Sequence, residues 1–166
     1  MANQDVVKEE HYYDLIAEEL ARLFKEKGIT VHLEITARRE MSDALKARMP
    51  RHMDVVLLFL KKVRPDITGY AEGKGFIVIE VKKKAGLDAI YQLKKYADLL
   101  DARFAFLVSL EPIPEDLKRL LDRLSLISKL KSSIHHVFVL TYFDVENRRF
   151  VEWFEEDPFS KNIYWQ

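Results

Sequence analysis

Residues 76–82 read Phe-Ile-Val-Ile-Glu-Val-Lys, a run of strand-favouring residues with apolar side chains at both odd and even positions. Successive side chains of a strand point to opposite faces, so the even-numbered residues share one face and the odd-numbered residues the other. Apolar residues on both faces predict a buried central strand. A carboxylate and an ammonium buried there are costly unless they pair or meet a metal, so Glu80 and Lys82 require an explanation.

Apolar periodicity and turn residues divide the rest of the chain into alternating strands and helices. Helices are predicted at 9–27, 87–101 and 115–131, and strands at 29–36, 53–60, 67–71, 76–81, 104–109, 136–143 and 150–154. No internal repeat or long linker interrupts this order. The pattern predicts a single α/β domain over residues 1–166.

Composition excludes several function classes. The 166 residues contain 27 Lys and Arg against 27 Asp and Glu, so any affinity for nucleic acid must come from a local patch. Cysteine is absent, which removes thiol nucleophiles and zinc-thiolate sites and leaves carboxylates and histidines as the strong metal ligands. No apolar run approaches the roughly 20 residues that span a bilayer, so we expect a cytoplasmic protein. The charged, cysteine-free composition also fits a thermophile.

The strand candidates at 67–71 and 76–81 predict a β-hairpin with its turn centred on Gly73. That centre places Asp66 opposite Glu80, with Cβ atoms about 4.5 to 5.5 Å apart. Two carboxylates so close repel each other unless one is protonated or a divalent cation lies between them. Two oxygen ligands plus waters suit Mg²⁺, and Lys82, on the face of Glu80, would reach a bound water or phosphate. This equipment suits phosphodiester hydrolysis by a metal-activated water.

The predicted helix at 87–101 carries two polar side chains on one face. Gln92 and Tyr96 are four residues apart and border the apolar stripe of the helix. Gln92 would orient the water or Lys82, and Tyr96 would donate to a phosphate oxygen. Neighbouring lysines add positive charge suited to a nucleic-acid backbone; they are Lys83, Lys84, Lys94 and Lys95.

The succession Pro65-Asp66, Glu80-Val81-Lys82 and Gln92-x-x-x-Tyr96 resembles the PD-(D/E)XK nuclease superfamily, in particular its RecB-like and Cas4-like branch. The resemblance covers residues 64–109 and, more loosely, the first helix. It implies a restriction-endonuclease-like α/β core, a mixed sheet flanked by helices. It further implies that Asp66 and Glu80 bind Mg²⁺ or Mn²⁺, that the Val81 carbonyl completes the shell, and that Lys82 positions the attacking water.

Many members of this superfamily also carry a glutamate on the first helix. The chain offers four candidates, of which we favour Glu19 because it borders the apolar face of the helix; the others are Glu9, Glu10 and Glu18. Asp54 lies at the opening of the predicted strand at 53–60 and is a further candidate ligand or a rival of Asp66.

Other segments allow alternative interpretations. Residues 37–52 carry a net charge of +3 and form either a solvated loop or a DNA-binding one. His135 and His136 are adjacent, so on a strand they point to opposite faces, and we expect structural roles for both. The aromatic tail at 162–166 is expected to pack onto the domain or onto the second subunit of a homodimer.

The sequence thus yields two leading hypotheses. The first is a Mg²⁺-dependent nuclease acting on DNA, and the second is a nuclease-fold module without turnover that binds nucleic acid or a protein partner. A third possibility is an α/β protein unrelated to nucleic acids. An acid two residues before a lysine is not informative alone, because the chain has it at Glu72, Glu80 and Asp116. Only Glu80 follows an apolar strand and faces a Pro-Asp.

Overall fold

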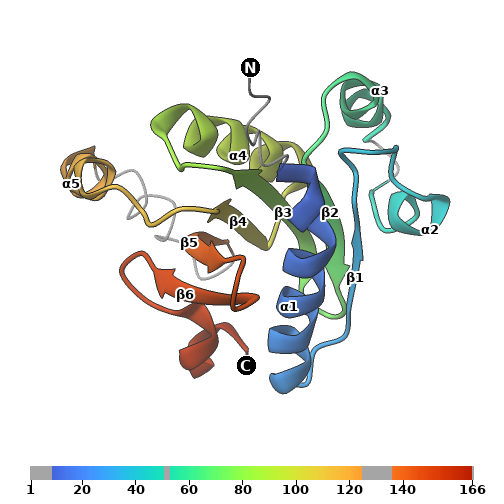
Figure 1. Ribbon diagram of the computed structural model, residues 1–166. Coiled ribbons are helices and arrows are strands. Elements are labelled where there is room, and N and C mark those ends of the chain that lie inside the picture. Colours follow the sequence, from blue (N-terminus) through green and yellow to red (C-terminus); the bar gives the residue numbers. More distant parts are fainter. Residues whose placement is uncertain (1–8, 51–52, 125–135, 166) are drawn as a thin grey trace, which may run out of the picture.

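The computed structural model describes residues 9–50, 53–124 and 136–165, and its centre is a six-stranded mixed sheet with helices on both faces (Figure 1). The strands lie in the sheet in their order along the chain. They are β1 (Val31–Glu34), β2 (Ile67–Ala71), β3 (Gly75–Lys82), β4 (Phe104–Ser109), β5 (Val137–Asp144) and β6 (Arg149–Trp153). The expected α/β class is therefore confirmed.

Two kinds of connection build this sheet. Strands β1, β2 and β3 form an antiparallel meander, and β5 and β6 form an antiparallel pair. Strands β3, β4 and β5 are parallel, with α4 (Leu87–Leu100) between the first two and α5 (Glu115–Leu124) after β4. The remaining helices are η1 (Glu9–Tyr12), α1 (Tyr13–Glu26), α2 (Asp43–Lys46), α3 (Asp54–Lys62), η2 (Pro158–Ser160) and η3 (Asn162–Tyr164).

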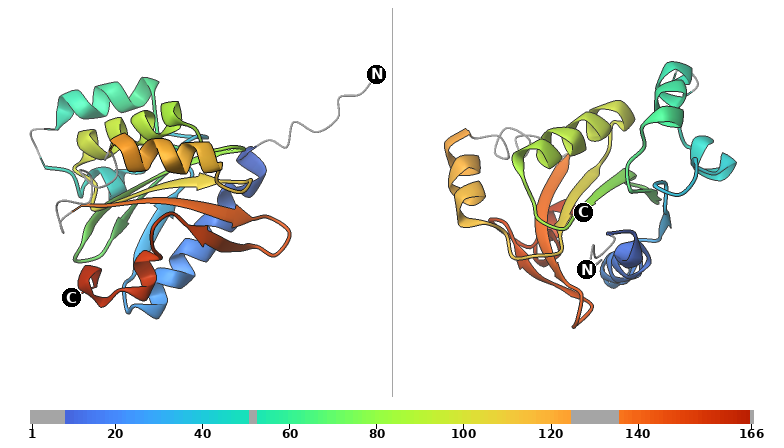
Figure 2. Two further views of the ribbon diagram at one scale, coloured as in Figure 1. Left: turned by 90° about the vertical axis from the view of Figure 1, so that its left-hand side faces the viewer. Right: turned by 45° about the horizontal axis from the view of Figure 1, so that its top comes forward.

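The sheet has an apolar core on each face. Helix α1 and the C-terminal segment cover one face, where they pack on the odd-numbered side chains of β3. Helices α4 and α5 cover the other face, where Phe76 and Val78 of β3 are buried. Figure 2 shows α1 and α4 on opposite sides of the sheet. The prediction that both faces of residues 76–82 are buried is confirmed, and β3 is a central strand.

The predicted hairpin register is also confirmed. Ile67 pairs with Ile79 and Ala71 with Gly75, so the turn is centred on Gly73. Gly73 has a φ of 74°, a left-handed conformation that glycine adopts without a steric cost. Extending the same register by one residue sets Asp66, immediately before β2, against Glu80.

One predicted element is wrong: residues 53–60 form no strand, and α3 occupies Asp54–Lys62 instead. Short apolar runs fit either state by periodicity alone. On the helix, Met53, Val56, Leu57 and Leu60 come together against the α4 side of the core. Asp54 in the first turn and two lysines in the last turn also match the helix dipole, a signal present in the sequence.

The other predicted elements are confirmed with shifts of a few residues at their ends. The predicted helix at 115–131 is described only to Leu124, because the remainder lies outside the described residues. The aromatic tail packs onto the domain as expected, with the Trp165 ring stacked on Phe104 and on Phe159. Among the described residues, no helix has the length and apolar character needed to cross a membrane.

Candidate active site

Two carboxylates meet where β2 begins and β3 ends. The Asp66 backbone N–H donates to Glu80 Oε1 over 3.2 Å, and the Val81 N–H donates to Asp66 Oδ2 over 2.8 Å. The backbone of Asp66 thus holds the Glu80 carboxylate, and the residue after Glu80 holds the Asp66 carboxylate. Glu80 is only 1% exposed, while Asp66 is half-buried. The sequence prediction that these two side chains lie together is confirmed.

The loop before Asp66 is fixed by the residues that follow β1. The Thr36 hydroxyl donates to the Pro65 carbonyl over 2.6 Å and lies 2.8 Å from the Thr68 hydroxyl. The Arg64 Nε donates to the Thr36 carbonyl, and the Ala37 N–H donates to the Asp66 carbonyl. These bonds determine the direction in which the Asp66 side chain leaves the loop.

The environment favours protonation of both carboxyl groups. Burial and the neighbouring Asp66 charge raise the pKa of Glu80 to about 8, against the opposing effect of Lys82. Burial also raises the pKa of Asp66, although the Val81 N–H, the Tyr13 hydroxyl and Lys82 act in the opposite direction. Without a bound cation, the pair therefore holds a proton near neutral pH.

Lys82 and Glu9 bring further charges to the pair. Lys82 is the last residue of β3, is half-buried, and its positive charge lowers the pKa of both carboxyl groups. Glu9 in η1 accepts a hydrogen bond from the Lys83 N–H over 3.0 Å, and its negative charge raises the pKa of Glu80 and of Asp66. The structure therefore brings Glu9, rather than Glu19, to this end of the sheet.

Tyr13 is a site residue that the sequence interpretation missed. Its buried side chain lies beside Asp66 and lowers the pKa of that carboxyl, while burial followed by the Asp66 charge raises the pKa of the phenol. Tyr13 begins the same helix face as the buried residues Ile16 and Leu20. A hydroxyl at the end of an apolar stripe was the available signal, because such a group needs a partner when it is buried.

Gln92 and Tyr96 lie on α4, on the core side of Glu80. The Tyr96 side chain is 0% exposed, and its hydroxyl forms no hydrogen bond with the residues that the structure describes. Burial, Glu80 and Asp66 raise the pKa of Tyr96, and the nearby Gln92 amide lowers it without reaching hydrogen-bond geometry. Tyr96 therefore presents an unused donor within electrostatic reach of the carboxylate pair.

The donor set fits a divalent cation of the Mg²⁺ type. Asp66 and Glu80 supply hard oxygen atoms, and their mutual repulsion is relieved by a positive ion. The N–H and C=O of one strand residue point the same way, so the Val81 carbonyl also faces the Asp66 side. Within residues 9–50, 53–124 and 136–165, no group of three His, Asp or Glu side chains is arranged to hold a metal. Such a cation would keep several waters.

Several predicted residues lie elsewhere. Glu19 pairs with Arg22 on the outside of α1 at 2.5 Å. Asp54 is exposed at the start of α3, so its expected position at the opening of a strand is wrong. His136 has the expected structural role, with Nδ1 2.9 Å from the Ala102 carbonyl oxygen. His135 lies outside the described residues.

The basic segment 37–52 is partly a core element. Met41, Leu45 and Met49 are buried on the α4 side of the sheet. Arg38 pairs with Asp14, and Arg48 pairs with Glu72. Within residues 37–50 the segment is therefore neither a free loop nor wholly solvated, and three of the four cations there pair with acids; Arg51 and His52 lie outside the described residues.

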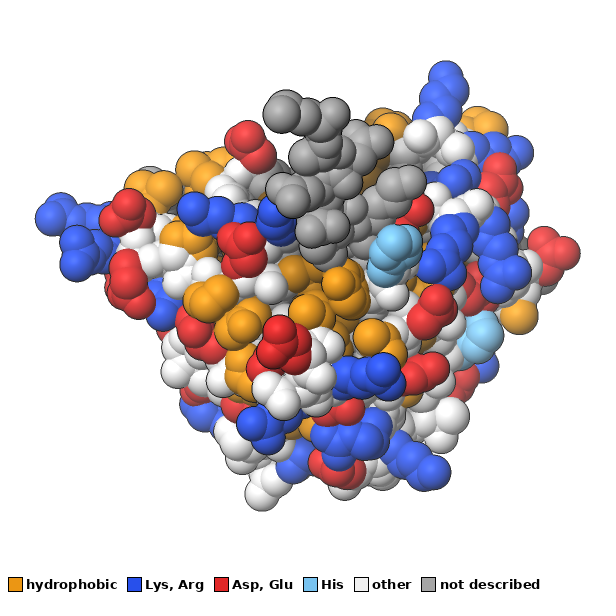
Figure 3. All heavy atoms as spheres, viewed as in Figure 1, with side chains coloured by type: hydrophobic (Ala, Val, Ile, Leu, Met, Phe, Trp, Pro, Cys, Tyr) orange, Lys and Arg blue, Asp and Glu red, His pale blue; other side chains and the backbone are white. Residues whose placement is uncertain are grey.

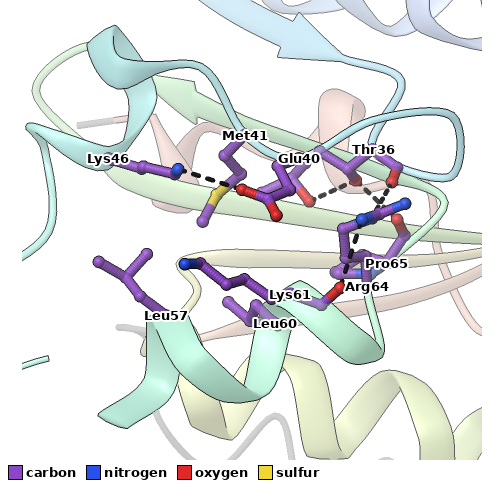
Figure 4. Close-up of a pocket in the computed structure, with 10 residues that line it drawn as sticks. Thr36, Glu40, Met41, Lys46, Leu57, Leu60, Lys61, Arg64 and Pro65 are labelled. Atoms are coloured by element: carbon purple, nitrogen blue, oxygen red, sulfur yellow. Dashed lines mark hydrogen bonds and ion pairs between the residues drawn. The ribbon is translucent and has the colours of Figure 1, made fainter. Parts of the chain in front are cut away.

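Three cationic side chains line a hollow beside the Asp66 loop. Figure 4 shows Lys46 and Lys61 extending toward it from α2 and α3, with Pro65 in its wall. Arg64 also lines it, and Glu40 pairs with Lys46 at 3.5 Å. Three cations against one acid make this a locally positive surface next to the carboxylate pair.

Comparisons of the chain with protein-family models, with curated proteins and with solved structures find no match. The function therefore has to be inferred from the residues of the site and their geometry.

Proposed function

We propose that this protein is a Mg²⁺-dependent nuclease that hydrolyses DNA phosphodiester bonds, with a restriction-endonuclease-like core of the PD-(D/E)XK type. The observation that carries the proposal is the pair of Asp66 and Glu80, opposed across the hairpin, with Asp66 half-buried, Glu80 buried and the pKa of Glu80 raised to about 8. Carboxyl groups whose pKa is raised by burial and by a neighbouring acid cluster at functional sites, because the same arrangement serves proton transfer and metal binding. The mixed sheet with helices on both faces agrees with the proposed core.

Asp66, Glu80 and the Val81 carbonyl would hold Mg²⁺ or Mn²⁺. The bound cation would supply Lewis acidity at the scissile phosphate and neutralise the two carboxylates. The protein supplies the orientation of these ligands, because backbone N–H groups fix Asp66 against β3. Tyr13 holds Asp66 from the α1 side, and the Thr36 bonds hold the preceding loop.

Lys82 acts in this proposal as the catalytic cation. It lies at the end of β3, on the face of Glu80, and is half-buried, so its charge is screened less than that of a surface lysine. There it would stabilise the negative charge that develops on the phosphate and orient the attacking water. The Tyr96 side chain is fully buried, so it would not touch the substrate; its unused hydroxyl would instead position Glu80 or a bound water, and Gln92 would orient that hydroxyl.

The DNA backbone would lie over the positive surface beside Asp66. Lys46, Lys61 and Arg64 surround the hollow in Figure 4, and Lys83 and Lys84 are exposed directly after β3. Because the chain has no net charge, this local patch would account for DNA affinity, which should fall steeply with salt. The absence of cysteine fits the reducing cytoplasm, where such a substrate is found.

A second candidate is a nuclease-fold module that binds nucleic acid or a protein partner without turnover. It is favoured by one observation: Glu80 is 1% exposed and its pKa is raised to about 8, so the pair can persist in a protonated form without a cation. In such a module the carboxylate pair would stay protonated, and no divalent cation would bind.

The test is a cleavage assay with linear duplex, circular duplex, single-stranded and four-way-junction DNA, in Mg²⁺, in Mn²⁺ and in chelator. We expect metal-dependent cleavage that Glu80→Gln reduces by about a hundredfold or more. The matched control is Glu72→Gln, which changes an acid two residues before a lysine in the same hairpin and should leave the rate within about twofold.

Cleavage that persists in chelator or in Glu80→Gln would contradict the proposal. Salt-dependent DNA binding without cleavage, and without Mn²⁺ binding by calorimetry, would favour the second candidate. No salt-dependent DNA binding at all would exclude both nucleic-acid functions.

A further inference from the structure

Helix α3 turns an apolar face outward. Val55, Leu58 and Phe59 are 77%, 62% and 43% exposed, and their spacing places them on one side of the helix. The opposite side, which includes Leu60, packs on the core. The helix is therefore apolar on two sides, of which one is buried in the core and the other is exposed to solvent.

Helix α4 borders this apolar face. Lys95 Nζ lies 5.8 Å from the centre of the Phe59 ring, so the two helices are neighbours here. Tyr91, one turn before Lys95 on α4, is 51% exposed. In Figure 3, the region of α3 at the upper right shows hydrophobic side chains at the surface beside Lys and Arg side chains. A contiguous patch of this kind, rimmed by charges, is typical of an interaction surface.

We propose that this outer face of α3, extended by Tyr91, is the interface between two copies of this chain. The two α3 helices would pack antiparallel across a two-fold axis near Leu58. In such an isologous contact, if one residue of the first copy contacts another residue of the second copy, the same two residues also contact each other with the copies exchanged. An axis at the middle of the helix brings Asp54 of one copy to Lys62 of the other.

The charges of α3 are self-complementary in that arrangement. Asp54 lies in the first turn, and Lys61 and Lys62 lie in the last turn. None of these three forms an ion pair with any residue that the structure describes, and all three are exposed. Antiparallel packing sets Asp54 of each copy beside Lys62 of the other, and it also opposes the two helix dipoles favourably.

A nucleic-acid strand fits the same face less well. It would place its phosphates near Asp54 as well as near the lysines, and the aliphatic side chains of Val55 and Leu58, the most exposed of the face, offer no stacking surface; only Phe59 and Tyr91 beside them are aromatic. A second copy neutralises Asp54 and covers the aliphatic side chains. The surface therefore favours self-association over a DNA-binding role.

The small area of the proposed interface indicates how stable the dimer should be. Nine residues of helix extend about 13 Å, which alone covers less than the roughly 800 Å² per partner of a standard interface. Tyr91 and Lys95 enlarge the contact from α4. We expect a dimer in equilibrium with monomer rather than a permanent one.

The first test is sedimentation equilibrium of the full chain across a wide concentration range, without DNA or metal. We expect reversible dimerisation, weakened about thirtyfold or more by Leu58→Asp. The matched control is Leu120→Asp, which changes a leucine that is also exposed on a helix, at 39%, but on α5. Leu120→Asp should leave dimerisation unchanged.

Charge reversal tests the antiparallel orientation. Asp54→Lys alone should weaken dimerisation, and Asp54→Lys combined with Lys61→Asp and Lys62→Asp should restore it. The natural chain contains no cysteine, so a single Leu58→Cys variant should form a disulfide-linked dimer under mild oxidation, while Leu120→Cys should not. This crosslink depends on the proximity of the two Leu58 positions near the axis and not on stability.

A monomer at all concentrations, or a dimer equally strong in Leu58→Asp and wild type, would overturn the proposal. A monomer whose salt-dependent DNA affinity is lost in Leu58→Asp would assign the face to nucleic acid instead and would also overturn it. Because the readout is mass in the absence of DNA, the outcome is independent of whether the protein is a nuclease.

Discussion

The two ends of the β2–β3 hairpin carry the same short pattern, an acid two residues before a lysine, in opposite environments. At the turn, Glu72 is exposed and pairs with Arg48 at 2.6 Å. At the other end, Glu80 is buried and held against the Asp66 backbone at 3.2 Å. Burial raises the pKa of Glu80 to about 8, whereas Glu72 has an oppositely charged neighbour and water.

The difference shows that the position in the fold, not the pattern, produces a reactive group. A surface ion pair such as Glu72 with Arg48 contributes under about 1 kcal/mol, because water solvates both partners almost as well apart. A carboxylate that is buried opposite another has no such alternative, so it takes up a proton or a cation. The following predictions test this contrast between the two ends.

The largest expected effect is on the pH dependence of stability without metal. The folded chain keeps a proton on Glu80 up to about pH 8, while the unfolded chain loses it near 4.5, so the folded state binds more protons in that window. The free energy of unfolding should therefore fall as pH rises from 4.5 toward 8, by about 1.4 kcal/mol per pH unit at most. Urea unfolding in chelator at several pH values measures this slope.

Glu80→Gln should flatten that slope, and Glu72→Gln should leave it unchanged. A slope equally steep in Glu80→Gln would show that the buried carboxylate pair is not its origin.

Divalent cations should stabilise the Glu80 end and not the Glu72 end. At a Mn²⁺ concentration ten times its dissociation constant, the free energy of unfolding rises by about 1.4 kcal/mol, which raises Tm by about 3 to 6 °C in a chain of this size. Differential scanning calorimetry with and without Mn²⁺ checks the shift. Glu72→Gln should retain the shift and Glu80→Gln should lose it, and a shift that survives in Glu80→Gln would place the cation elsewhere.

The Tyr96→Phe variant should have opposite effects on the stability of the protein and on its activity. The Tyr96 hydroxyl is buried without a hydrogen bond, so its removal should stabilise the metal-free protein by about 1 kcal/mol. The same variant should cleave DNA about tenfold more slowly, because the hydroxyl proposed to position Glu80 or its bound water is lost. Loss of stability in Tyr96→Phe would instead indicate that the hydroxyl has a structural partner.

The smallest effect is expected at the turn. Glu72→Gln should destabilise the protein by less than about 1 kcal/mol, because it weakens one exposed pair with Arg48. Unfolding in low and in high salt checks this, since the difference between variant and wild type should shrink as salt screens the pair. A cost well above this limit would mean that the turn end is not simply a solvated surface.

The hairpin and its neighbours were predictable from local chemistry. Gly73 centres the turn, the period-two alternation sets the faces of β3, and these two features together place Asp66 against Glu80. The α4 face that carries Gln92 and Tyr96 follows from the helical period in the same way. Such features depend on residues that are close in sequence, so a single amino-acid sequence is enough to predict them.

Helix α3 and the partners of the first helix were not predictable on that basis. The run Val55-Val56-Leu57-Leu58 fits a strand or a helix, and the choice depended on whether a sheet edge or the core beside α4 was available. Likewise, α1 carries several acids, and only its docking on the sheet brings Tyr13 to Asp66 and leaves Glu19 with Arg22.

The sequence by itself determined the α/β class, the register of the hairpin and the pairing of Asp66 with Glu80, because turn geometry and side-chain alternation act over a few residues. Only the tertiary structure decided that α3 is a helix with an apolar outer face, that Tyr13 and Glu9 adjoin the carboxylate pair, and that the Tyr96 hydroxyl has no partner. Those outcomes depend on which distant segments compete for the same surface, a comparison of burial free energies that no local pattern contains.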